Sequence, residues 1–286
     1  MYRRIVEWLR KTKKKMTYSM QVLYQRIKKD NTDSKCPYCG GKSNLIGFKK
    51  MILTLYECKL CGLRFRVPKG YPEGAFEYYN KEYSEEAVNT YPSKKEIEDR
   101  SFENYMGNRT SFVKRVLSCK SPKTFLDYGC AWGYRVDWME RKGIEEAIGY
   151  EVSNQMAEFG RSNLDVDIYT DLNYLRKKYS SEVDMIYTSH VLEHLEEYSN
   201  LFEAFRSLLC PEGYLVIIVP NASDRALASR NLSSWGELVG KSHTAAFTFE
   251  FFENVLPEEG FSILCKGKKS HEEIRIVSKL KCEYSS

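Results

Sequence analysis

Residues 123–140, KTFLDYGCAWGYRVDWME, decide the fold of this chain. The apolar start ends at Asp127 and is typical of a buried parallel strand. Gly129, Ala131 and Gly133 then form a turn in which the backbone can lie directly against a ligand. The residues after Gly133 continue as a helix. The order of strand, glycine turn and helix predicts a doubly wound α/β fold that binds a nucleotide at this turn.

An acidic residue follows the turn at the spacing that nucleotide-binding folds use. Glu151 ends a second strand-like stretch, residues 147–151, about 20 residues further on. A carboxylate at this place holds the hydroxyl groups of a ribose. A glycine turn alone is weak evidence, but here the turn, its flanking strand and helix and the spaced carboxylate agree. Together they predict a ligand that contains an adenosyl group.

Strand-like stretches alternate with helical ones along the rest of the chain. They lie at residues 167–170, 183–189, 214–219, 261–266 and 273–277. Such alternation predicts a parallel sheet with helices on both faces, and it places the ligand site at the carboxyl ends of the strands.

Two blocks of the chain resemble the class I S-adenosylmethionine-dependent methyltransferases. Residues 127–133, DYGCAWG, are similar to motif I of that superfamily, and residues 183–195, VDMIYTSHVLEHL, are similar to its fourth-strand motif. The resemblance implies a seven-stranded, Rossmann-like sheet whose last two strands form an antiparallel hairpin at one edge. It also implies S-adenosylmethionine as the cofactor.

Two later blocks continue the resemblance in the same order, so that it covers about residues 103–280. Residues 209–221, LCPEGYLVIIVPN, resemble the turn and fifth strand. Residues 243–248, HTAAFT, resemble a late, substrate-side block of one branch that modifies small molecules and glycans. The chain departs from the commonest pattern at Ala131, where glycine is usual, but alanine is small enough to leave cofactor binding intact.

The resemblance assigns contacts with the cofactor to individual residues. Gly129, Ala131 and Gly133 would approach its methionine part. Asp127 would orient the amino group, and Glu151 would bind both ribose hydroxyls.

Three further positions complete this predicted cofactor site. Asp171 occupies the place that meets the adenine amino group in the superfamily, with Leu172 as a stacking neighbour, and Ser189 ends the strand at residues 183–189. Asp171 also precedes Leu-Asn-Tyr-Leu and is an equally good helix cap. Both interpretations of Asp171 stay open at this point.

Histidines are the candidates for the acceptor side, because a hydroxyl gives up its proton reluctantly and an imidazole suits proton removal near pH 7. His190 directly follows a strand, where the methyl group is expected, and His243 lies in the late block. Both are predicted to act as base or substrate contact, with a structural role at a helix start as the alternative for His190. His194, together with Glu193, is expected to anchor the helix, and His271 is expected to face solvent.

The same histidines match another motif. His190-Val-Leu-Glu193-His194 fits the His-x-x-Glu-His pattern of inverted zinc proteases. That pattern requires a helix and a third ligand, whereas here it begins at the end of a strand inside a cofactor-binding sheet. We therefore reject the protease interpretation.

Two Cys-x-x-Cys pairs precede the catalytic part. Cys36 and Cys39 are separated from Cys58 and Cys61 by 18 residues, and residues 45–56 between them are predicted to form a hairpin. This spacing is typical of a four-thiolate Zn²⁺ site. Such a closed site leaves no position for water or substrate, so the predicted role is a folding staple. Disulfide pairing is the alternative, disfavoured because the N-terminus lacks the pattern of a secretory signal.

Charge is unevenly distributed along the chain, whose net charge is +5. Residues 1–30 carry +8, residues 31–75 carry +5, and the remainder carries −8. The catalytic part is therefore not built to hold a polyanion by itself. The first 30 residues are predicted to form a basic amphipathic helix with one apolar stripe. Three alternatives stay open for it: packing on the protein itself or on a second copy in a homodimer, contact with an anionic membrane surface, or contact with nucleic acid.

These observations divide the chain into four parts: a basic helix (1–30), a zinc ribbon (31–75), a linker or lid (76–102) and a methyltransferase domain (103–286). The ribbon and the following YYNKEY segment at residues 78–83 resemble the accessory module of bacterial sugar-modifying methyltransferases. This resemblance implies methyl transfer to a hydroxyl or amine of a sugar, glycan or related small molecule.

Two alternatives to a glycan acceptor remain. The first is an rRNA or tRNA methyltransferase that binds RNA through its basic N-terminal modules, a layout similar to that of zinc-ribbon rRNA guanine methyltransferases. The second is a non-catalytic, zinc-dependent binding or scaffold protein. The longest aliphatic run, residues 215–219, is far below the roughly 18 apolar residues of a spanning helix. We therefore expect a cytoplasmic protein, with membrane association open through the first helix.

Overall fold

The computed structural model describes residues 34–49, 53–69, 71, 77–83, 122–198, 200–240, 242–268 and 271–282. The predicted basic helix at residues 1–30 and most of the predicted linker at 76–102 lie outside the described residues, so the four-part division of the chain stays a prediction.

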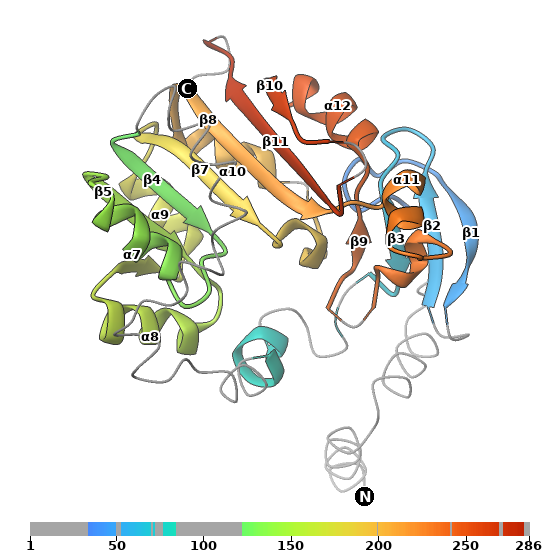
Figure 1. Cartoon of the computed structure of the whole chain (residues 1–286), viewed down its shortest axis with the longest axis horizontal. Coiled ribbons are helices and arrows are strands. Elements are labelled where there is room, and N and C mark those ends of the chain that lie inside the picture. The colour runs from blue at the N-terminus through green and yellow to red at the C-terminus, as the bar shows by residue number, and fades with distance from the viewer. Residues whose placement is uncertain are drawn as a thin grey trace, which may run out of the picture.

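The larger of two sheets has seven strands in the order β10-β11-β8-β7-β4-β5-β6 (Figure 1). Neighbours from β8 to β6 pair in parallel, whereas β11 pairs antiparallel with both β8 and β10. This confirms the predicted Rossmann-like α/β sheet and its antiparallel edge hairpin. The strands are β4 (Thr124–Tyr128), β5 (Glu146–Tyr150), β6 (Asp167–Tyr169), β7 (Val183–Ser189), β8 (Leu209–Pro220), β10 (Phe261–Lys266) and β11 (Glu273–Leu280).

Helices cover both faces of this sheet, because alternate strand residues point to opposite sides. Phe125 packs with residues of α7 and α8, while the adjacent Leu126 packs with residues of α9, α10 and α12. The strands therefore read as nearly continuous apolar runs, as expected for a sheet buried on both faces. The helices are α7 (Tyr134–Arg141), α8 (Asn154–Leu164), α9 (Leu172–Lys178), α10 (Leu201–Leu208), α11 (Asp224–Ser229) and α12 (Phe249–Glu258).

The order of the strands fixes the place of a ligand site. The chain runs from β4 outward to β5 and β6, and then returns to β7 and β8 on the other side of β4. The switch point therefore lies between β4 and β7, and a crevice forms beyond the carboxyl ends of these two strands.

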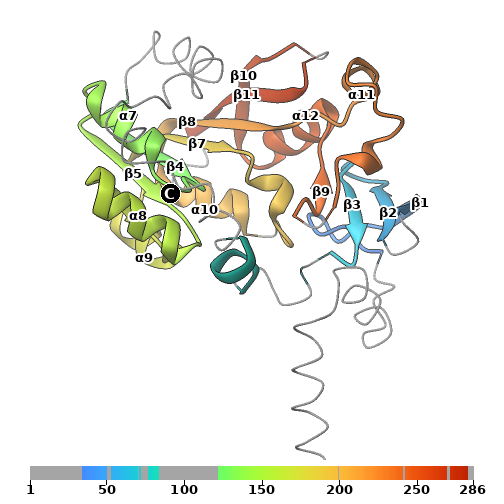
Figure 2. The same ribbon diagram turned by 60° about the horizontal axis from the view of Figure 1, so that its bottom comes forward.

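A smaller sheet combines the cysteine segment with a strand from the far end of the chain. It has the order β1-β2-β3-β9, where β1 (Ser43–Lys49), β2 (Leu53–Cys58) and β3 (Arg64–Val67) come from the cysteine segment and β9 (Ala245–Ala246) comes from the late block. The antiparallel pairing of β1 with β2 confirms the predicted hairpin. In both views the small sheet lies beside α11 and away from α7 and α8 (Figure 1, Figure 2).

The cysteine segment shares a hydrophobic core with the large sheet. Phe65 and Leu63 belong to the same buried cluster as Phe247, Phe251 and Phe252. The pairing of β3 with β9 adds backbone hydrogen bonds between the two parts. The cysteine segment is thus packed as part of the enzyme core.

Within the described residues, the helices are too short or too polar to cross a membrane.

Candidate functional site

The glycine turn joins β4 to α7 and buries the predicted Asp127. This carboxylate has no exposed surface, and both of its oxygens accept hydrogen bonds at 2.8 Å from Nη1 of Arg135. Arg135 in turn lies over the ring of Tyr187, 4.2 Å from its centroid. Burial raises the pKa of Asp127, and the neighbouring guanidinium opposes this shift. Asp127 therefore fixes the base of the turn, while its predicted contact with the cofactor amino group stays a prediction.

Glycine is required in the turn for two reasons. Gly129 and Gly133 both have φ of +81°, in the left-handed region that glycine adopts without steric cost. A Cβ atom on Gly129 would also lie 2.2 Å from Cγ2 of Val191, which follows β7. The turn thus approaches the loop after β7 closely across the switch point. Ala131 has φ of +50°, which explains why glycine is the usual residue there.

Glu151 lies at the end of β5 and faces the turn. It is 7% exposed, its Oε2 accepts a hydrogen bond from the backbone N–H of Ala131, and its Oε1 accepts one from Ser153, both at 2.9 Å. Burial raises the pKa of Glu151, and these two N–H groups oppose the shift. The carboxylate is held against the turn, where a ribose bound in the crevice would lie.

The other predicted cofactor residues lie on both sides of this centre. Asp171 is exposed and caps α9, because its Oδ1 accepts hydrogen bonds from the backbone of Asn173 and Tyr174. The capping interpretation is confirmed, and the adenine contact stays a prediction. Leu172 is half-buried against the core. Ser189 ends β7, and its buried hydroxyl has no hydrogen-bond partner among the described residues.

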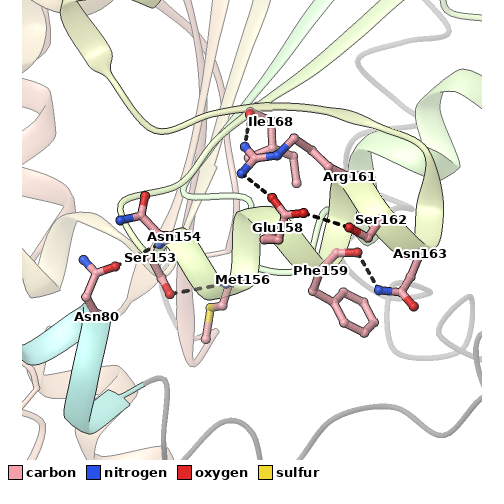
Figure 3. Close-up of polar contacts among 10 residues, drawn as sticks. All are labelled: Asn80, Ser153, Asn154, Met156, Glu158, Phe159, Arg161, Ser162, Asn163 and Ile168. Carbon is pink, nitrogen blue, oxygen red and sulfur yellow. Dashed lines mark hydrogen bonds and ion pairs between the residues drawn. The ribbon is translucent and has the colours of Figure 1, made fainter.

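A short π-helix, η1 (Tyr78–Tyr83), lies next to the carboxyl ends of the strands, between α8 and the small sheet (Figure 1, Figure 2). Asn80 donates a hydrogen bond to the carbonyl of Val152. It also accepts one from the backbone N–H of Asn154, at the start of α8 (Figure 3). Tyr79 contacts the ring of His194 at 6.2 Å between centroids. The described part of the predicted lid therefore spans from the Glu151 side of the crevice to its histidine side.

His190 directly follows β7 and lies between two carboxylates. Its Nε2 is 2.9 Å from Oε1 of Glu273, on β11, and its Nδ1 is 3.1 Å from Oε1 of Glu193. The residue has φ of +56°, which is uncommon for a residue with a side chain and turns the chain sharply at the strand end. Burial works to raise the pKa of Glu193, but His190 and the charges of His194 and His243 outweigh it and lower the pKa.

His194 and His243 meet at the same place. Their rings lie edge to face with centroids 4.7 Å apart, and Nδ1 of His243 is 2.9 Å from the carbonyl oxygen of Leu238. Burial lowers the pKa of His194 to about 4, so its ring is neutral at pH 7. His271 is exposed, as expected. The structure thus brings together both predicted catalytic histidines with Glu193 and His194.

The local backbone also bears on the protease-like pattern. Glu193 and His194 belong to a three-residue 3₁₀ turn, η2 (Leu192–His194), and His190 precedes it with left-handed φ. The pattern therefore does not lie on an α-helix, in agreement with its rejection.

Sequence reasoning missed several residues of the crevice. Glu273 and Tyr71 were not predicted, and no motif in the sequence marks them. Asn80 lies in the YYNKEY segment, but no role was predicted for it. Arg135 follows Asp127 by eight residues and lies in the first turn of α7, so its pairing was detectable in principle. Tyr71 is buried, and its hydroxyl donates a hydrogen bond of 2.7 Å to the carbonyl of Ser242, next to His243.

The four predicted metal-ligating cysteines form a second cluster, in the small sheet. Sγ of Cys36 and Sγ of Cys61 are 3.6 Å apart, and Sγ of Cys39 lies 3.4 Å from that of Cys58 and 3.7 Å from that of Cys61. All four are free thiols, which rules out the disulfide alternative for this structure. Four thiolates around a tetrahedral ion with bonds of about 2.3 Å would be separated by roughly 3.8 Å. The donor set therefore fits Zn²⁺.

The fold and the glycine turn with its spaced carboxylate define a doubly wound enzyme of the class that binds an adenosyl cofactor. The chain belongs to the methyltransferase-domain family, whose model matches residues 101–266, more than half of its length. The protein is an S-adenosylmethionine-dependent methyltransferase.

A solved methyltransferase structure agrees with this fold. The chain is similar to magnesium protoporphyrin IX methyltransferase from Synechocystis PCC 6803, solved with bound SAH, at 15% identity and a TM-score of 0.52, over 72% of this chain and 97% of the other. It is also similar to a SAM-dependent methyltransferase from Archaeoglobus fulgidus at 20% identity and a TM-score of 0.47, over 62% and 97% of the two chains. No curated protein matches the chain.

Proposed function

We propose that the protein transfers the methyl group of S-adenosylmethionine to a hydroxyl of a sugar, glycan or related small polar acceptor, with an amine as the chemical variant. The observation that carries this proposal is the polar cluster after β7. His190, Glu193, His194 and His243 lie together beside Val191, which contacts the glycine turn. A site of this polarity favours an acceptor that forms hydrogen bonds and releases a proton.

The reaction is an in-line displacement at an activated carbon. The acceptor oxygen forms a bond with the methyl carbon, the bond from that carbon to sulfur breaks, and S-adenosylhomocysteine leaves. The protein must therefore align the two molecules, exclude water and accept the hydroxyl proton.

We assign His190 as the proton acceptor. It lies at the carboxyl end of β7, where the methyl group is expected. Glu193 and Glu273 flank its ring. A neutral ring donates its one N–H to one of these carboxylates, so the acceptor hydroxyl must displace the other carboxylate from the second nitrogen before His190 takes up the proton. The two carboxylates would then stabilise the imidazolium that forms. His243 also lies close to Glu193 and is our second acceptor-side residue.

Contacts of the cysteine segment favour a small acceptor over RNA. The RNA alternative depends on basic side chains near the cysteines, but three of these contact the methyltransferase part. Arg66 is fully buried and donates a hydrogen bond to the carbonyl of Gly240, and Arg64 donates one to that of Ala222, each at 2.7 Å. Lys49 donates a hydrogen bond to the carbonyl of Val239. These cations stabilise the packing of the small sheet and are not arranged to bind phosphates.

We also propose that the four cysteines hold a structural Zn²⁺. The sulfur separations and the closed, four-thiolate donor set support this ion. Its function would be to stabilise the small sheet, whose β3 pairs with β9 and so positions the segment that begins at His243. The roles predicted for residues 1–30, in dimerisation or at a membrane surface, stay predictions, as does the cytoplasmic location.

A labelling experiment on the full-length protein tests the acceptor. Radiolabelled S-adenosylmethionine is supplied with a panel of nucleotide sugars and oligosaccharides or with total RNA, after calorimetry has verified cofactor binding. We expect label in a small-molecule or glycan product. Label in RNA would overturn the proposed acceptor class, and absence of cofactor binding would overturn the enzyme itself.

A charge variant adds a control to this experiment. Lys59 is an exposed lysine within the second cysteine pair, directly after Cys58. Lys59→Glu should leave transfer to the small acceptor unchanged, whereas an RNA enzyme would show weaker, more salt-sensitive RNA binding in this variant.

A further inference from the structure

Three side chains near the carboxyl end of β7 place ligand atoms close together. Glu193, His194 and His243 each offer one such atom, and these atoms all lie within 4.8 Å of one another. Two of the residues come from η2, while the third comes from the segment before β9, 49 residues beyond His194. The close approach is therefore a product of the tertiary fold. Ligands of a single ion with bonds of about 2.1 Å are separated by roughly 3–4 Å, so only a small contraction is needed.

In each of the two imidazoles, hydrogen bonding leaves one nitrogen as the basic one. A carbonyl oxygen only accepts hydrogen bonds, so Nδ1 of His243, 2.9 Å from the oxygen of Leu238, carries the proton and leaves Nε2 as the basic nitrogen. His194 is hydrogen-bonded to the backbone of Ser242, whereas its buried Nδ1 has no hydrogen-bond partner among the described residues. Metal-binding histidines are characteristically fixed in this way, with the second ring nitrogen donating to a backbone carbonyl.

Glu193 supplies the negative charge of the cluster. Its side chain is 1% exposed, and Oε2 has no hydrogen-bond partner within the described part of the chain. Oε1 makes an ion pair with Nδ1 of His190 at 3.1 Å. A buried carboxylate with such incomplete hydrogen bonding is costly, and a cation next to Oε2 would compensate it.

We propose that Glu193, His194 and His243 bind a divalent transition-metal cation of the Zn²⁺, Mn²⁺ or Fe²⁺ type. One carboxylate and two imidazoles are ligands that such ions accept, and a three-ligand set keeps coordination positions open for an exogenous oxygen. In this respect the cluster differs from the four cysteines, whose thiolate set is closed.

The catalytic role of this cation rests on the proposed function, whereas the binding of the cation to the three residues does not depend on it. A cation here would withdraw electron density from a coordinated hydroxyl of the acceptor and lower its pKa. The proton would pass to the neutral ring of His190, which contacts Glu193, and the oxygen would attack the methyl carbon as the carbon–sulfur bond breaks. The site would thereby select a hydroxyl acceptor over an amine, since a protonated amine offers no lone pair to a cation.

Cobalt binding to the full-length protein provides the test. The protein is stripped of metal and titrated with Co²⁺, while metal content is determined by elemental analysis. Thiolate-to-cobalt bands in the near ultraviolet report the four cysteines, and weaker visible bands without thiolate character report the carboxylate–imidazole site. We expect two equivalents in the wild-type protein. Uptake of only the thiolate-bound equivalent would overturn the proposal.

Matched variants locate the second equivalent. Glu193→Gln and His243→Ala should weaken it by at least about 100-fold, because each removes a direct ligand. Glu197→Gln, an exposed carboxylate of the same loop, and His271→Ala, an exposed histidine, should retain it. Retention of the second equivalent in both Glu193→Gln and His243→Ala would also refute the site. The thiolate bands and calorimetric cofactor binding verify that each variant is folded.

The two proposals fail separately. If label appears on a small acceptor but only one metal equivalent binds, the proposed cation site is wrong and the proposed function stands. If two metal equivalents bind but label appears on RNA, the cation site stands and the proposed acceptor class is wrong.

Discussion

The two sides of the crevice differ in how their buried polar groups are satisfied. On the glycine-turn side, both oxygens of Asp127 bind Arg135, and both oxygens of Glu151 bind backbone N–H groups. On the histidine side, Oε2 of Glu193 and Nδ1 of His194 have no hydrogen-bond partners among the described residues. The two carboxylates of the first side are satisfied by the protein itself, whereas the carboxylate and imidazole of the second side keep atoms without partners, as expected of a site that needs a ligand.

The two sides are also stabilised by different parts of the chain. The glycine turn and Glu151 depend on β4, β5 and the adjacent helices. The histidine side depends on the small sheet through Thr244, next to His243. The backbone N–H of Thr244 donates a hydrogen bond to the backbone carbonyl of Glu193, and the backbone carbonyl of Thr244 accepts one from the N–H of Arg66 in β3. Damage to the cysteine cluster should therefore affect acceptor chemistry more than cofactor binding.

The largest effect is expected for Cys61→Ser. Loss of one thiolate should release the proposed zinc and loosen β3, and with it the segment that carries His243. We expect methyl transfer to fall by more than about 10³-fold, while cofactor affinity changes by only a few fold, since no cysteine ligand contacts the glycine turn. Activity assays and calorimetry measure the two quantities. Cys265→Ser, at an exposed position on β10, is the control. Equal loss of both quantities would refute the distinction between the sides.

Gly129→Ala should damage both sides at once. The new Cβ atom would lie 2.2 Å from Val191, in a residue whose φ is +81°. We expect a loss of about 2–4 kcal/mol in the free energy of unfolding and roughly 100-fold weaker cofactor binding, measured by denaturant titration and calorimetry.

Two comparisons separate the causes of this effect. Gly143 has φ of +86° but open space around it, so Gly143→Ala should show the backbone strain alone, about 1 kcal/mol. Val191→Ala in the Gly129→Ala background should recover the part of the lost unfolding free energy that is due to the steric clash. If the double variant is no more stable than Gly129→Ala, the contact across the switch point is not the cause.

His190→Ala tests the histidine side directly. Removal of the proposed proton acceptor should lower turnover by about 10²-fold, while the dissociation constant of S-adenosylmethionine stays the same. Single-turnover kinetics and calorimetry measure the two effects, and His271→Ala is the control. A weakened cofactor affinity at unchanged turnover would show that His190 belongs to the cofactor side.

The difference between the sides also explains what the sequence could predict. The glycine turn and Glu151 lie within about 30 consecutive residues, in a strand–turn–helix unit whose spacing is set by the fold, so a local pattern identifies them. The histidine side is assembled from distant segments: His190 meets Glu273 across 83 residues, and His194 meets His243 across 49. Such contacts depend on strand order and register, which no local pattern specifies.

The cysteine segment shows both cases together. The two Cys-x-x-Cys pairs predicted the convergence of four sulfurs, because ligand spacing within a knuckle is local. The pairing of β3 with β9 and the burial of Arg66 were not predicted, since a basic residue beside a zinc knuckle is equally typical of an exposed, nucleic-acid-binding surface. Only the tertiary structure shows that its guanidinium binds backbone carbonyls.

Glu151→Gln should give a moderate effect confined to the cofactor side. The amide keeps the shape of the carboxylate but loses the charge that strengthens hydrogen bonds from ribose hydroxyls. The affinity for S-adenosylmethionine should therefore fall by about 10-fold, while turnover at saturating cofactor stays nearly unchanged. Glu158→Gln, an exposed position on α8, is the control.

The stability of the same variant should depend less on pH. Burial raises the pKa of Glu151 above 4.5 in the folded protein, so the folded state retains a proton that the unfolded state has already lost. The free energy of unfolding therefore decreases as pH rises from 4.5 through the folded-state pKa, and Glu151→Gln should remove this decrease. Denaturant titrations across this range measure the effect; an unchanged pH slope would show that Glu151 ionises normally.

The smallest effect, and the one of opposite sign, is expected for Ala131→Gly. Ala131 has φ of +50°, which costs a residue with a Cβ atom about 1–2 kcal/mol. Glycine removes that cost and adds about 0.5–1 kcal/mol of unfolded-state entropy, so the variant should be more stable by up to about 1 kcal/mol. Its backbone N–H still donates to Glu151, so cofactor affinity should be maintained. Ala228→Gly, at an exposed position in α11, should instead destabilise by about 1 kcal/mol. Thermal and denaturant unfolding measure the change in the free energy of unfolding for both variants. Destabilisation by Ala131→Gly would show that the backbone is unstrained at this residue, so that only the glycines of the turn adopt a conformation that is costly for other residues.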